Sequence, residues 1–423
     1  MMRGDELSGF ASSDPVLRDR LTGLQSAEDF MRRLQRMLST RSGTGSSVVY
    51  LDIADMKSVN SADGTEVGDE VIRRTGRAMA EVFGAGSCAR VAGDRFIAVT
   101  PAALAAPRVG QVVDMASRTH GTRTMHVHVG IYDVRDGDES GMLACDRAKW
   151  AATVDGGVHA STVARFDATM ASAMDTELYV RSRIDDVMAG DRIQVWYQPI
   201  VRADTLEVAH REALARWFRE SGDILPPASF VPTLESSRAC VLLDRLVMRT
   251  VAADARRLLD AGLRDVAGFS VNVSRVDLLE TDVAADLAGA LDALSVSHDV
   301  VTVEITEGAA EVGIDVLERQ IHGLHERGFE VWMDDFGEGL SSLGALQRLD
   351  FDLVKLDRSL VRDVAASERA RIVAGFAVEM ARGIGIPVVA EGVESEEQER
   401  FMVGAGCDYL QGYRYGRPAP LTA

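Results

Sequence analysis

Acidic and amide side chains stand at the ends of apolar runs throughout the second half of the chain. Glu304 and Glu307 close the run Val-Glu-Ile-Thr-Glu, and Asp334 and Asp335 directly follow Val-Trp-Met. A single acid at a strand end commonly caps a helix or faces solvent, but this repeated pattern favours a shared site. The full set comprises Glu212, Asn272, Glu304, Glu307, Asp334, Asp335, Lys355, Asp357, Glu391, Glu394 and Gln411.

Carboxylates gathered at one place need a countercharge, because like charges a few ångströms apart raise each other's pKa. A hard divalent cation would supply it. Oxygen ligands without a histidine cluster or thiolates favour Mg²⁺ or Mn²⁺, and we expect a pair of ions. Such a pair suits the in-line attack of water on a phosphodiester bond, with Lys355 orienting the water or neutralising developing charge.

Eight apolar segments, separated by helical ones, must position these side chains. This pattern over about 230 residues predicts a (β/α) barrel, in which the strand ends converge on one mouth. The predicted strands are 196–200, 207–216, 269–273, 300–305, 330–333, 353–356, 388–390 and 409–410.

The first half alternates predicted helices and strands, which indicates a compact α/β sandwich. We expect helices over 21–38, 67–83 and 143–152, strands over 48–53 and 125–131, and a loop over 41–47. Strands 88–91 and 96–100 flank the turn Gly93-Asp94 as a hairpin. A single helix over 163–188 is predicted to connect this domain to the barrel.

Ordered motifs identify a family for the second half. The segment 193–418 resembles the EAL family of cyclic di-GMP phosphodiesterases. The matching motifs are Tyr-Gln-Pro-Ile (197–200), Glu-Ala-Leu-Ala-Arg (212–216), Ser-Val-Asn (270–272), Glu-Ile-Thr-Glu (304–307), Asp-Asp-Phe-Gly (334–337), Lys-Leu-Asp (355–357), Ala-Glu-Gly-Val-Glu (390–394) and Gln-Gly-Tyr (411–413).

The resemblance implies a TIM-like (β/α)8 barrel enzyme that opens cyclic di-GMP to linear pGpG with two Mg²⁺ or Mn²⁺ ions. It also implies residue roles: one ion held by Glu212, Asn272, Glu304 and Asp334, the second served by Asp334, Asp335 and Glu391, water positioned by Lys355 and Asp357, substrate contacted by Gln198 and Arg216, and Gln411 near the active site.

One position departs from the EAL pattern. The family usually reads Asp-Asp-Phe-Gly-Thr-Gly, and this chain has Glu338 in place of the threonine. Glu307 resembles the family glutamate that braces this loop, which also contributes to dimer contacts. An added acid there could repel Glu307, but we expect hydrolysis to be retained.

The first half, over 17–167, resembles a GGDEF domain, an α/β sandwich of the nucleotidyl-cyclase type that makes cyclic di-GMP from GTP. The matches are Leu-Thr-Gly-Leu (21–24), Leu-Asp-Ile (51–53), Lys57, Asn60, Gly68-Asp69, His-Val-Gly-Ile (128–131) and Ala148-Lys149.

The GGDEF signature itself is altered. It reads Ala92-Gly93-Asp94-Arg95-Phe96, and Ala54 replaces the second acid of the usual Asp-x-Asp. Arg95 cannot coordinate a cation or act as a base, so we expect no cyclase activity. Asp52 and Asp94 remain at family metal positions, and Asn60 and Asp69 remain where the family reads guanine and ribose. A GTP sensor and a scaffold that only helps dimerisation both stay open.

Composition limits the partners. The chain has 423 residues, 46% of them hydrophobic, and a formal net charge of −19, which excludes general affinity for nucleic-acid polymers. The absence of a long apolar run or a secretory leader predicts a cytoplasmic protein without a membrane segment. Four isolated cysteines are expected to be buried thiols.

The sequence therefore predicts four parts: a polar tail (1–16), a degenerate GGDEF domain (17–167), a connecting helix (168–190) and an EAL domain (191–423). The preferred function is hydrolysis of cyclic di-GMP, with a homodimer expected from the family. The alternatives are a non-enzymatic cyclic di-GMP receptor, which only Glu338 favours, and an interaction scaffold.

Overall fold

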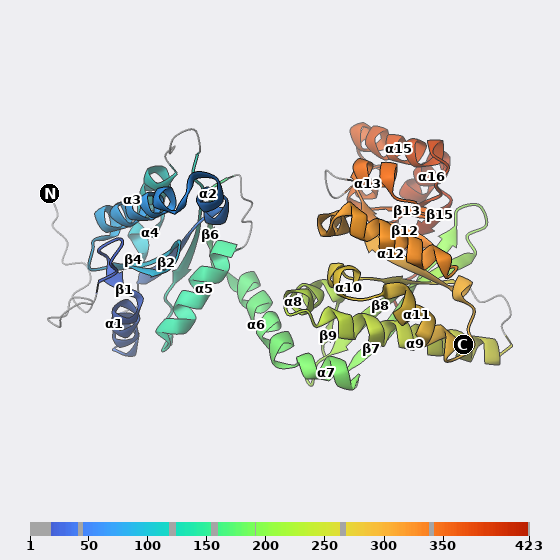
Figure 1. Ribbon diagram of the computed structural model, residues 1–423, viewed down its shortest axis with the longest axis horizontal. Helices are drawn as coiled ribbons and strands as arrows, with labels where there is room; N and C mark the ends of the chain where they lie inside the picture. The colour runs from blue at the N-terminus through green and yellow to red at the C-terminus, as the bar shows by residue number, and fades with distance from the viewer. Residues whose placement is uncertain are drawn as a thin grey trace. The chain divides into compact units, whose positions relative to one another are not determined.

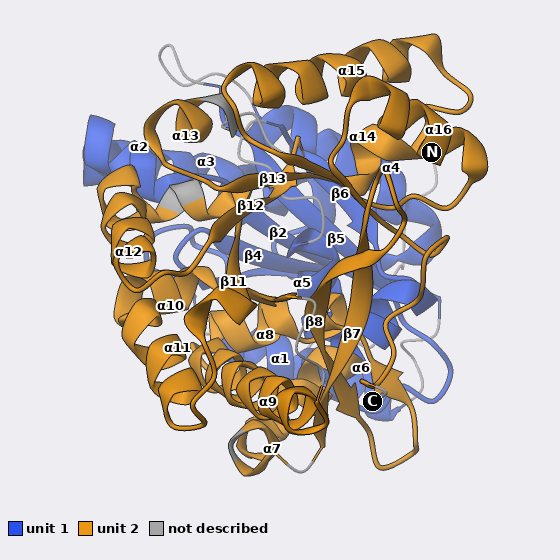
Figure 2. Cartoon of the chain, turned by 90° about the vertical axis from the view of Figure 1, so that its right-hand side faces the viewer, with its two compact units in different colours: residues 1–175 blue, residues 176–423 orange. Residues whose placement is uncertain are grey.

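The computed structural model describes residues 18–40, 45–117, 124–153, 160–190, 192–262, 268–337 and 342–421. The chain divides into two compact units, residues 1–175 and 176–423, which are coloured separately in Figure 2. Glu338 lies outside the described residues. No helix in the described part of the chain is long and apolar enough to cross a membrane.

Unit 1 is built on a mixed six-stranded sheet in the order β1-β3-β4-β2-β5-β6. The central strands pair antiparallel, whereas β1 pairs with β3 and β6 with β5 in parallel. The strands are β1 Gln25–Ser26, β2 Ser46–Ile53, β3 Cys88–Ala92, β4 Arg95–Pro101, β5 Val127–Asp133 and β6 Thr162–Arg165.

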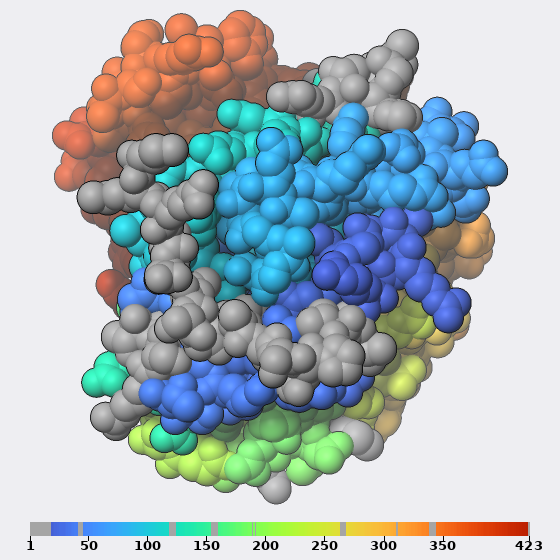
Figure 3. Space-filling view, turned by 90° about the vertical axis from the view of Figure 1, so that its left-hand side faces the viewer, coloured from blue at the N-terminus to red at the C-terminus, as the bar shows by residue number. Residues whose placement is uncertain are grey.

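Helices cover both faces of this sheet, so the predicted α/β sandwich is confirmed (Figure 1). Val49 and Leu51 of β2 pack in one apolar core with α3 and α4, and Val48 and Tyr50 pack in a second core with α1 and α5. This alternation follows from the two-residue period of a strand. Figure 3 shows the blue outer surface of unit 1. The helices are α1 Ala27–Ser39, α2 Met56–Asp63, α3 Thr65–Phe83, α4 Ala102–Ala116 and α5 Gly141–Thr153.

Two helix predictions were wrong at their starts. The helix predicted over 21–38 begins only at Ala27, because Ser26 adopts extended backbone and its side chain accepts a hydrogen bond from the Asp29 amide. The helix predicted over 163–188 opens as strand β6 and then divides into α6 (Ala168–Ser182) and α7 (Ile184–Ala189). Backbone pairing with β5 outweighs the weak helical pattern at 162–165.

Unit 2 is a closed barrel of eight strands. The order is β10-β11-β12-β13-β14-β15-β7-β8, and β8 pairs with β10 to close it, while β9 (Ile224–Leu225) extends β8 outside the ring. All eight predicted strands are present: β7 Ile193–Arg202, β8 Val208–Phe218, β10 Gly268–Asn272, β11 Val301–Thr306, β12 Val331–Phe336, β13 Leu353–Leu356, β14 Val388–Ala390 and β15 Tyr409–Gln411.

The barrel departs from a regular (β/α)8 arrangement at its first strand. β7 runs antiparallel to both neighbours, β8 and β15, because the short connection 203–207 reverses the chain without a crossover helix. Helices surround the ring, as the orange unit in Figure 2 shows. They are α8 Val231–Ser236, α9 Cys240–Asp260, α10 Arg275–Glu280, α11 Val283–Asp292, α12 Ile314–Glu326, α13 Ser342–Arg348, α14 Arg358–Arg362, α15 Glu368–Gly383 and α16 Glu396–Ala405.

Candidate active site

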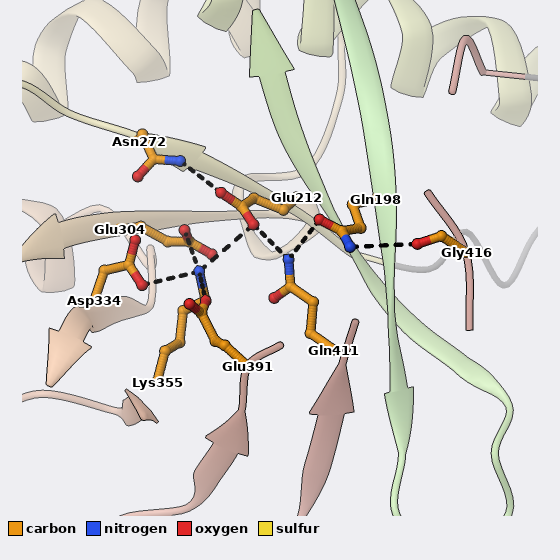
Figure 4. A network of polar contacts seen from close by, with 9 residues as sticks. All are labelled: Gln198, Glu212, Asn272, Glu304, Asp334, Lys355, Glu391, Gln411 and Gly416. Atoms are coloured by element: carbon orange, nitrogen blue, oxygen red, sulfur yellow. Dashed lines mark hydrogen bonds and ion pairs between the residues drawn. The ribbon is translucent and has the colours of Figure 1, made fainter. Parts of the chain in front are cut away.

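A single lysine lies at the centre of the acidic site inside the barrel (Figure 4). The ammonium Nζ of Lys355 lies 2.8 Å from Glu304 Oε2, 3.0 Å from Asp334 Oδ1 and 2.6 Å from Glu391 Oε1. A fourth acid, Glu212, lies 3.6 Å away. The side chains of Lys355 and Glu304 are fully buried. Four carboxylates therefore surround one fully buried ammonium group.

The strands explain why these groups meet. Glu304 and Lys355 lie on β11 and β13, on either side of β12, which carries Asp334 near its carboxyl end. The parallel pairing of β12 with both neighbours places the three side chains near the same end of the barrel. Glu391 follows β14 directly, and its amide donates to the backbone oxygen of Leu356 at 3.1 Å.

Amide side chains surround Glu212 on the other side of the site. Asn272 Nδ2 donates to Glu212 Oε1 at 3.0 Å, and Gln411 Nε2 donates to Oε2 at 2.5 Å. Gln411 lies 3.4 Å from Gln198 Oε1, and Gln198 in turn donates to the backbone oxygen of Gly416 at 3.3 Å. The network ties β7, β8, β10 and β15 to one carboxylate and fixes its orientation.

Burial and mutual repulsion disturb the protonation of this site. The pKa of Glu304 is raised to about 8, chiefly by burial and also by the charges on Glu212 and Asp334, against the lowering effect of Lys355. Burial likewise raises the pKa of Glu391 well above its usual value. Burial alone would lower the pKa of Lys355, but the surrounding carboxylates raise it well above its ordinary value. Glu304 and Glu391 therefore hold their protons more readily than ordinary carboxyl groups do.

The donor set fits divalent cations. Two acid groups each bring one oxygen per residue within 4.8 Å of the others: Glu212, Glu304 and Asp334, and then Asp334, Asp335 and Glu391. Asp334 belongs to both groups. Glu304 Oε1 is buried and has no hydrogen-bond partner among the described residues. An all-oxygen set with an unused buried carboxylate oxygen suits Mg²⁺ or Mn²⁺.

Asp335, which belongs to the second acid group, has an unusual backbone conformation. Its φ is +57°, a conformation that residues other than glycine rarely adopt, and the β12–β13 pairing shifts register between Met333 and Phe336. Such strain concentrates at functional sites. Glu307 lies just beyond, where its Oε2 accepts a hydrogen bond from the Gly337 amide at 3.1 Å. Glu307 therefore holds the start of the loop after β12.

Two predicted site residues make their described contacts away from the acid cluster. Asp357 caps α14, its Oδ1 accepting a hydrogen bond from the Ser359 amide at 2.8 Å. Arg216 Nη1 donates to the Ala215 backbone oxygen at 2.9 Å, and its guanidinium lies 5.7 Å from the Trp196 ring centroid. Burial lowers the pKa of Arg216, and Glu212 partly offsets that effect.

Two cavities meet at β8, sharing Glu212 and Leu214. One, of about 410 Å³, is polar and contains Asp334, Asp335 and Glu391 together with Arg358 and Arg362, two cations that the sequence analysis did not single out. No motif distinguishes these arginines from the many others in the chain. The second, of about 360 Å³, is mainly apolar and is lined by Pro227, Val231, Leu243, Val247, Asp244 and Asn272, among others.

The hairpin of unit 1 places Arg95 between two acids. Arg95 Nε lies 3.7 Å from Asp52 Oδ1 and 3.9 Å from Asp94 Oδ1. Burial raises the pKa of Asp52, and Asp94 raises it further. Within the described part of the chain, the groups of three or more acids close enough to share a metal ion both lie in the barrel.

The other predicted nucleotide contacts of unit 1 lie on or beside α3. A Cβ added at Gly68 would stand 2.0 Å from Asn60 Oδ1, so the Asn60 side chain lies directly against the backbone of α3. Asp69 lies 3.8 Å from Arg73, one turn further along the same helix.

Comparison with known proteins assigns both units. Residues 181–418 match the family model for the EAL domain, and residues 16–151 match the model for the diguanylate cyclase GGDEF domain. An uncharacterized signaling protein of Caulobacter vibrioides is 31% identical over 421 residues, covering 96% of this chain and 51% of that protein. The cyclic di-GMP phosphodiesterase NbdA of Pseudomonas aeruginosa is 29% identical over 419 residues, covering 96% and 53%.

The chain thus spans about half the length of these curated relatives. Among solved structures, the PaMucR phosphodiesterase in complex with c-di-GMP superposes with a TM-score of 0.54 at 28% identity, covering 57% of this chain and 98% of that one. The chain is therefore a tandem GGDEF–EAL protein related to cyclic di-GMP phosphodiesterases, and it belongs to the EAL domain family.

Proposed function

We propose that the barrel hydrolyses cyclic di-GMP to linear pGpG. The observation that carries this proposal is the buried cluster of four carboxylates around Lys355, which has the composition of a site for two divalent cations. The likeness to a phosphodiesterase solved with c-di-GMP supports the choice of substrate.

Two overlapping ligand sets would hold Mg²⁺ or Mn²⁺. The first is Glu212, Asn272, Glu304 and Asp334, and the second is Asp334, Asp335 and Glu391. When bound, the ions supply Lewis-acid activation of the attacking water and stabilise the charge on the phosphodiester. Rotation of the Asn272 side chain would be needed first, because its amide nitrogen faces Glu212.

The chain's own residues would then position the reactants. Lys355 is fully buried among the acids, where its ammonium can orient a water and balance charge that develops during attack. Asp357, at the end of the same strand, would help to position that water. Gln198, Arg216 and Gln411 would contact the substrate, with the guanidinium of Arg216 suited to a phosphate.

The two joined cavities fit a substrate with charged and apolar parts. A phosphodiester belongs at the acid cluster of the polar cavity, where Arg358 and Arg362 add positive charge. A guanine base belongs in the apolar cavity, whose walls include Pro227 and Val231. Because the cavities share Glu212, one dinucleotide can reach both.

We propose a regulatory rather than synthetic role for unit 1. Arg95 occupies the position of the usual acid and pairs with Asp52 and Asp94, so this pair is already partly neutralised by the protein. Synthesis of cyclic di-GMP is therefore not expected. We also propose that unit 1 binds GTP near Asn60 and Asp69. The hydrolysis assay described next, run with and without GTP, tests this.

The experiment is chromatographic detection of pGpG from cyclic di-GMP with Mg²⁺ or Mn²⁺, with and without GTP. Glu212→Gln keeps the side-chain shape and removes a carboxylate, and Glu318→Gln on the exposed side of α12 is the matched control. We expect product from the wild type and Glu318→Gln only. Retained binding of cyclic di-GMP without product would instead support the receptor function, and a change in rate on adding GTP would support sensing by unit 1.

A further inference from the structure

We propose that Glu235 and Arg275 determine the specificity of the barrel for guanine. The carboxylate of Glu235 accepts hydrogen bonds from N1–H and the 2-amino group of the base, and the guanidinium of Arg275 donates to O6 and N7. These contacts rest on the function proposed above, because a guanine base of the substrate must enter the apolar cavity before the two residues can bind it.

The two residues face each other on the lining of the apolar cavity. Glu235 lies on α8 and Arg275 is the first residue of α10, and these two helices both pack against α9 in unit 2 (Figure 1). Arg275 Nη2 lies 3.7 Å from Glu235 Oε2, and both residues line the cavity together with apolar residues such as Val231 and Pro232. An acceptor group and a donor group therefore stand side by side next to an apolar surface.

The other charged residues that line this cavity already have a place in the structure. Glu212 belongs to the acid cluster, and the buried Asp244 accepts a hydrogen bond from the Ser274 amide at 3.0 Å. Glu235 and Arg275 are the remaining charged residues among the described lining, and their side chains are 25% and 44% exposed. An ion pair this long and this exposed contributes little to stability. A ligand can therefore bind both groups at small cost to the fold.

The hydrogen-bonding groups of guanine match this pair. N1–H and the 2-amino group are neighbouring donors, and O6 and N7 are neighbouring acceptors. A carboxylate accepts from two neighbouring donors, and a planar guanidinium donates to two neighbouring acceptors. Adenine has an amino donor in the place of O6 and an unprotonated N1, so it presents a donor to Arg275 and an acceptor to Glu235. The pair therefore favours guanine over adenine.

A base analogue tests the contact with Glu235 in the full chain. Hypoxanthine is guanine without the 2-amino group, so cyclic di-IMP removes one donor to Glu235. We expect the wild type to prefer cyclic di-GMP to cyclic di-IMP by about tenfold or more in kcat/KM, and Glu235→Ala to reduce that preference to less than about threefold. Glu280→Ala is the matched control, because Glu280 also pairs with an arginine, Arg238, but lies outside the residues that line the cavity.

A second analogue tests the contact with Arg275. Cyclic di-GMP built from 7-deazaguanine replaces only the N7 acceptor with C–H. The wild type should lose about fivefold or more in kcat/KM on this replacement, whereas Arg275→Met should lose less than about twofold. Both variants should unfold within about 2 °C of the wild type, because the ion pair is partly exposed. A merely structural role would lower the melting temperature and leave both analogue preferences unchanged.

Titration calorimetry with the same nucleotides in Mg²⁺ separates the guanine contacts from the hydrolysis proposed above. Binding with the expected analogue preferences but without pGpG would refute hydrolysis and still support the contacts. Production of pGpG with the same analogue preferences in the wild type and in both variants would overturn the contacts alone. A wild type that neither binds nor hydrolyses cyclic di-GMP would overturn both.

Discussion

Replacing Lys355 with methionine tests the charge balance of the barrel site most directly. The substitution keeps an apolar stem of similar length and removes the one ammonium that contacts Glu304, Asp334 and Glu391 at 2.6–3.0 Å. These carboxylates then face one another without a protein countercharge. We expect the variant to fold less stably without metal and to lose hydrolysis.

The magnitude follows from burial. Removing one partner of a buried ion pair costs about 3–5 kcal/mol, and three contacts to a fully buried ammonium place Lys355 toward the upper end. In a unit of this size each kcal/mol lowers the melting temperature by about 2–4 °C, so we expect a loss of about 10 °C or more in EDTA. Divalent cations replace the missing charge, so Mn²⁺ should recover at least half of that loss.

The stability of the folded barrel depends on pH with a definite sign. The pKa of Glu304 is raised to about 8 in the folded state, above the ordinary carboxyl value of 4.5, so the folded state binds the extra proton. The resulting stability is fully present below pH 4.5 and is lost as the pH rises through 8. Protonated acids need no countercharge. The difference between Lys355→Met and wild type should therefore be largest above pH 8 and shrink toward pH 5.

Thermal unfolding is followed by circular dichroism, in EDTA and in Mn²⁺ at pH 5, 7 and 8.5. These conditions measure the loss of melting temperature, its recovery by Mn²⁺ and its pH dependence. Lys57→Met, at an exposed lysine on α2, is the control for the loss of a positive charge. A Lys355→Met protein that unfolds within about 2 °C of wild type in EDTA at pH 8.5 would refute the reasoning, because that difference corresponds to no more than about 1 kcal/mol.

Three further substitutions test the surroundings of the site. Arg216→Ala should raise KM for cyclic di-GMP with little change in melting temperature, because its described contacts are a backbone oxygen and an aromatic face; steady-state kinetics checks this. Gly412→Ala should destabilise the barrel by about 2 kcal/mol or more, measured by urea unfolding, since its Cβ would lie 2.0 Å from the Val393 oxygen. Ser395→Ala removes the capping box of α16 and should cost about 1 kcal/mol in the same measurement.

The sequence predicted the barrel strands well because each is a short apolar run that its neighbours bury on both sides. The segments predicted at 353–356 and 388–390 coincide with β13 and β14. The antiparallel direction of β7 was not predicted, because apolar periodicity is the same in either direction. Only the short connection 203–207 signals the reversal, by leaving no room for a crossover helix.

The sequence predicted which acids would cluster. It did not predict which of them would contact Lys355 and share its positive charge. Strand ends in a barrel converge, so acids after apolar runs meet whatever their distance along the chain. The sequence does not say that Lys355 contacts three acids while Asp357 caps a helix only two residues later. Those outcomes depend on the direction in which each side chain leaves its strand. Arg358 and Arg362 were missed for a related reason, since short helix α14 turns them toward the polar cavity after the motif has ended.

The distribution of lysine and arginine along the chain supports the assignment of the barrel site. Arginine provides nearly all of its 46 basic residues, and lysine occurs only at Lys57, Lys149 and Lys355. Lys355 is surrounded by four acids at full burial, where a compact ammonium fits and a planar guanidinium would need more space and more acceptors. The other two lie in unit 1 at positions of the GGDEF pattern. In the barrel, lysine thus stands where the space within a buried acid cluster, and not charge alone, favours the residue.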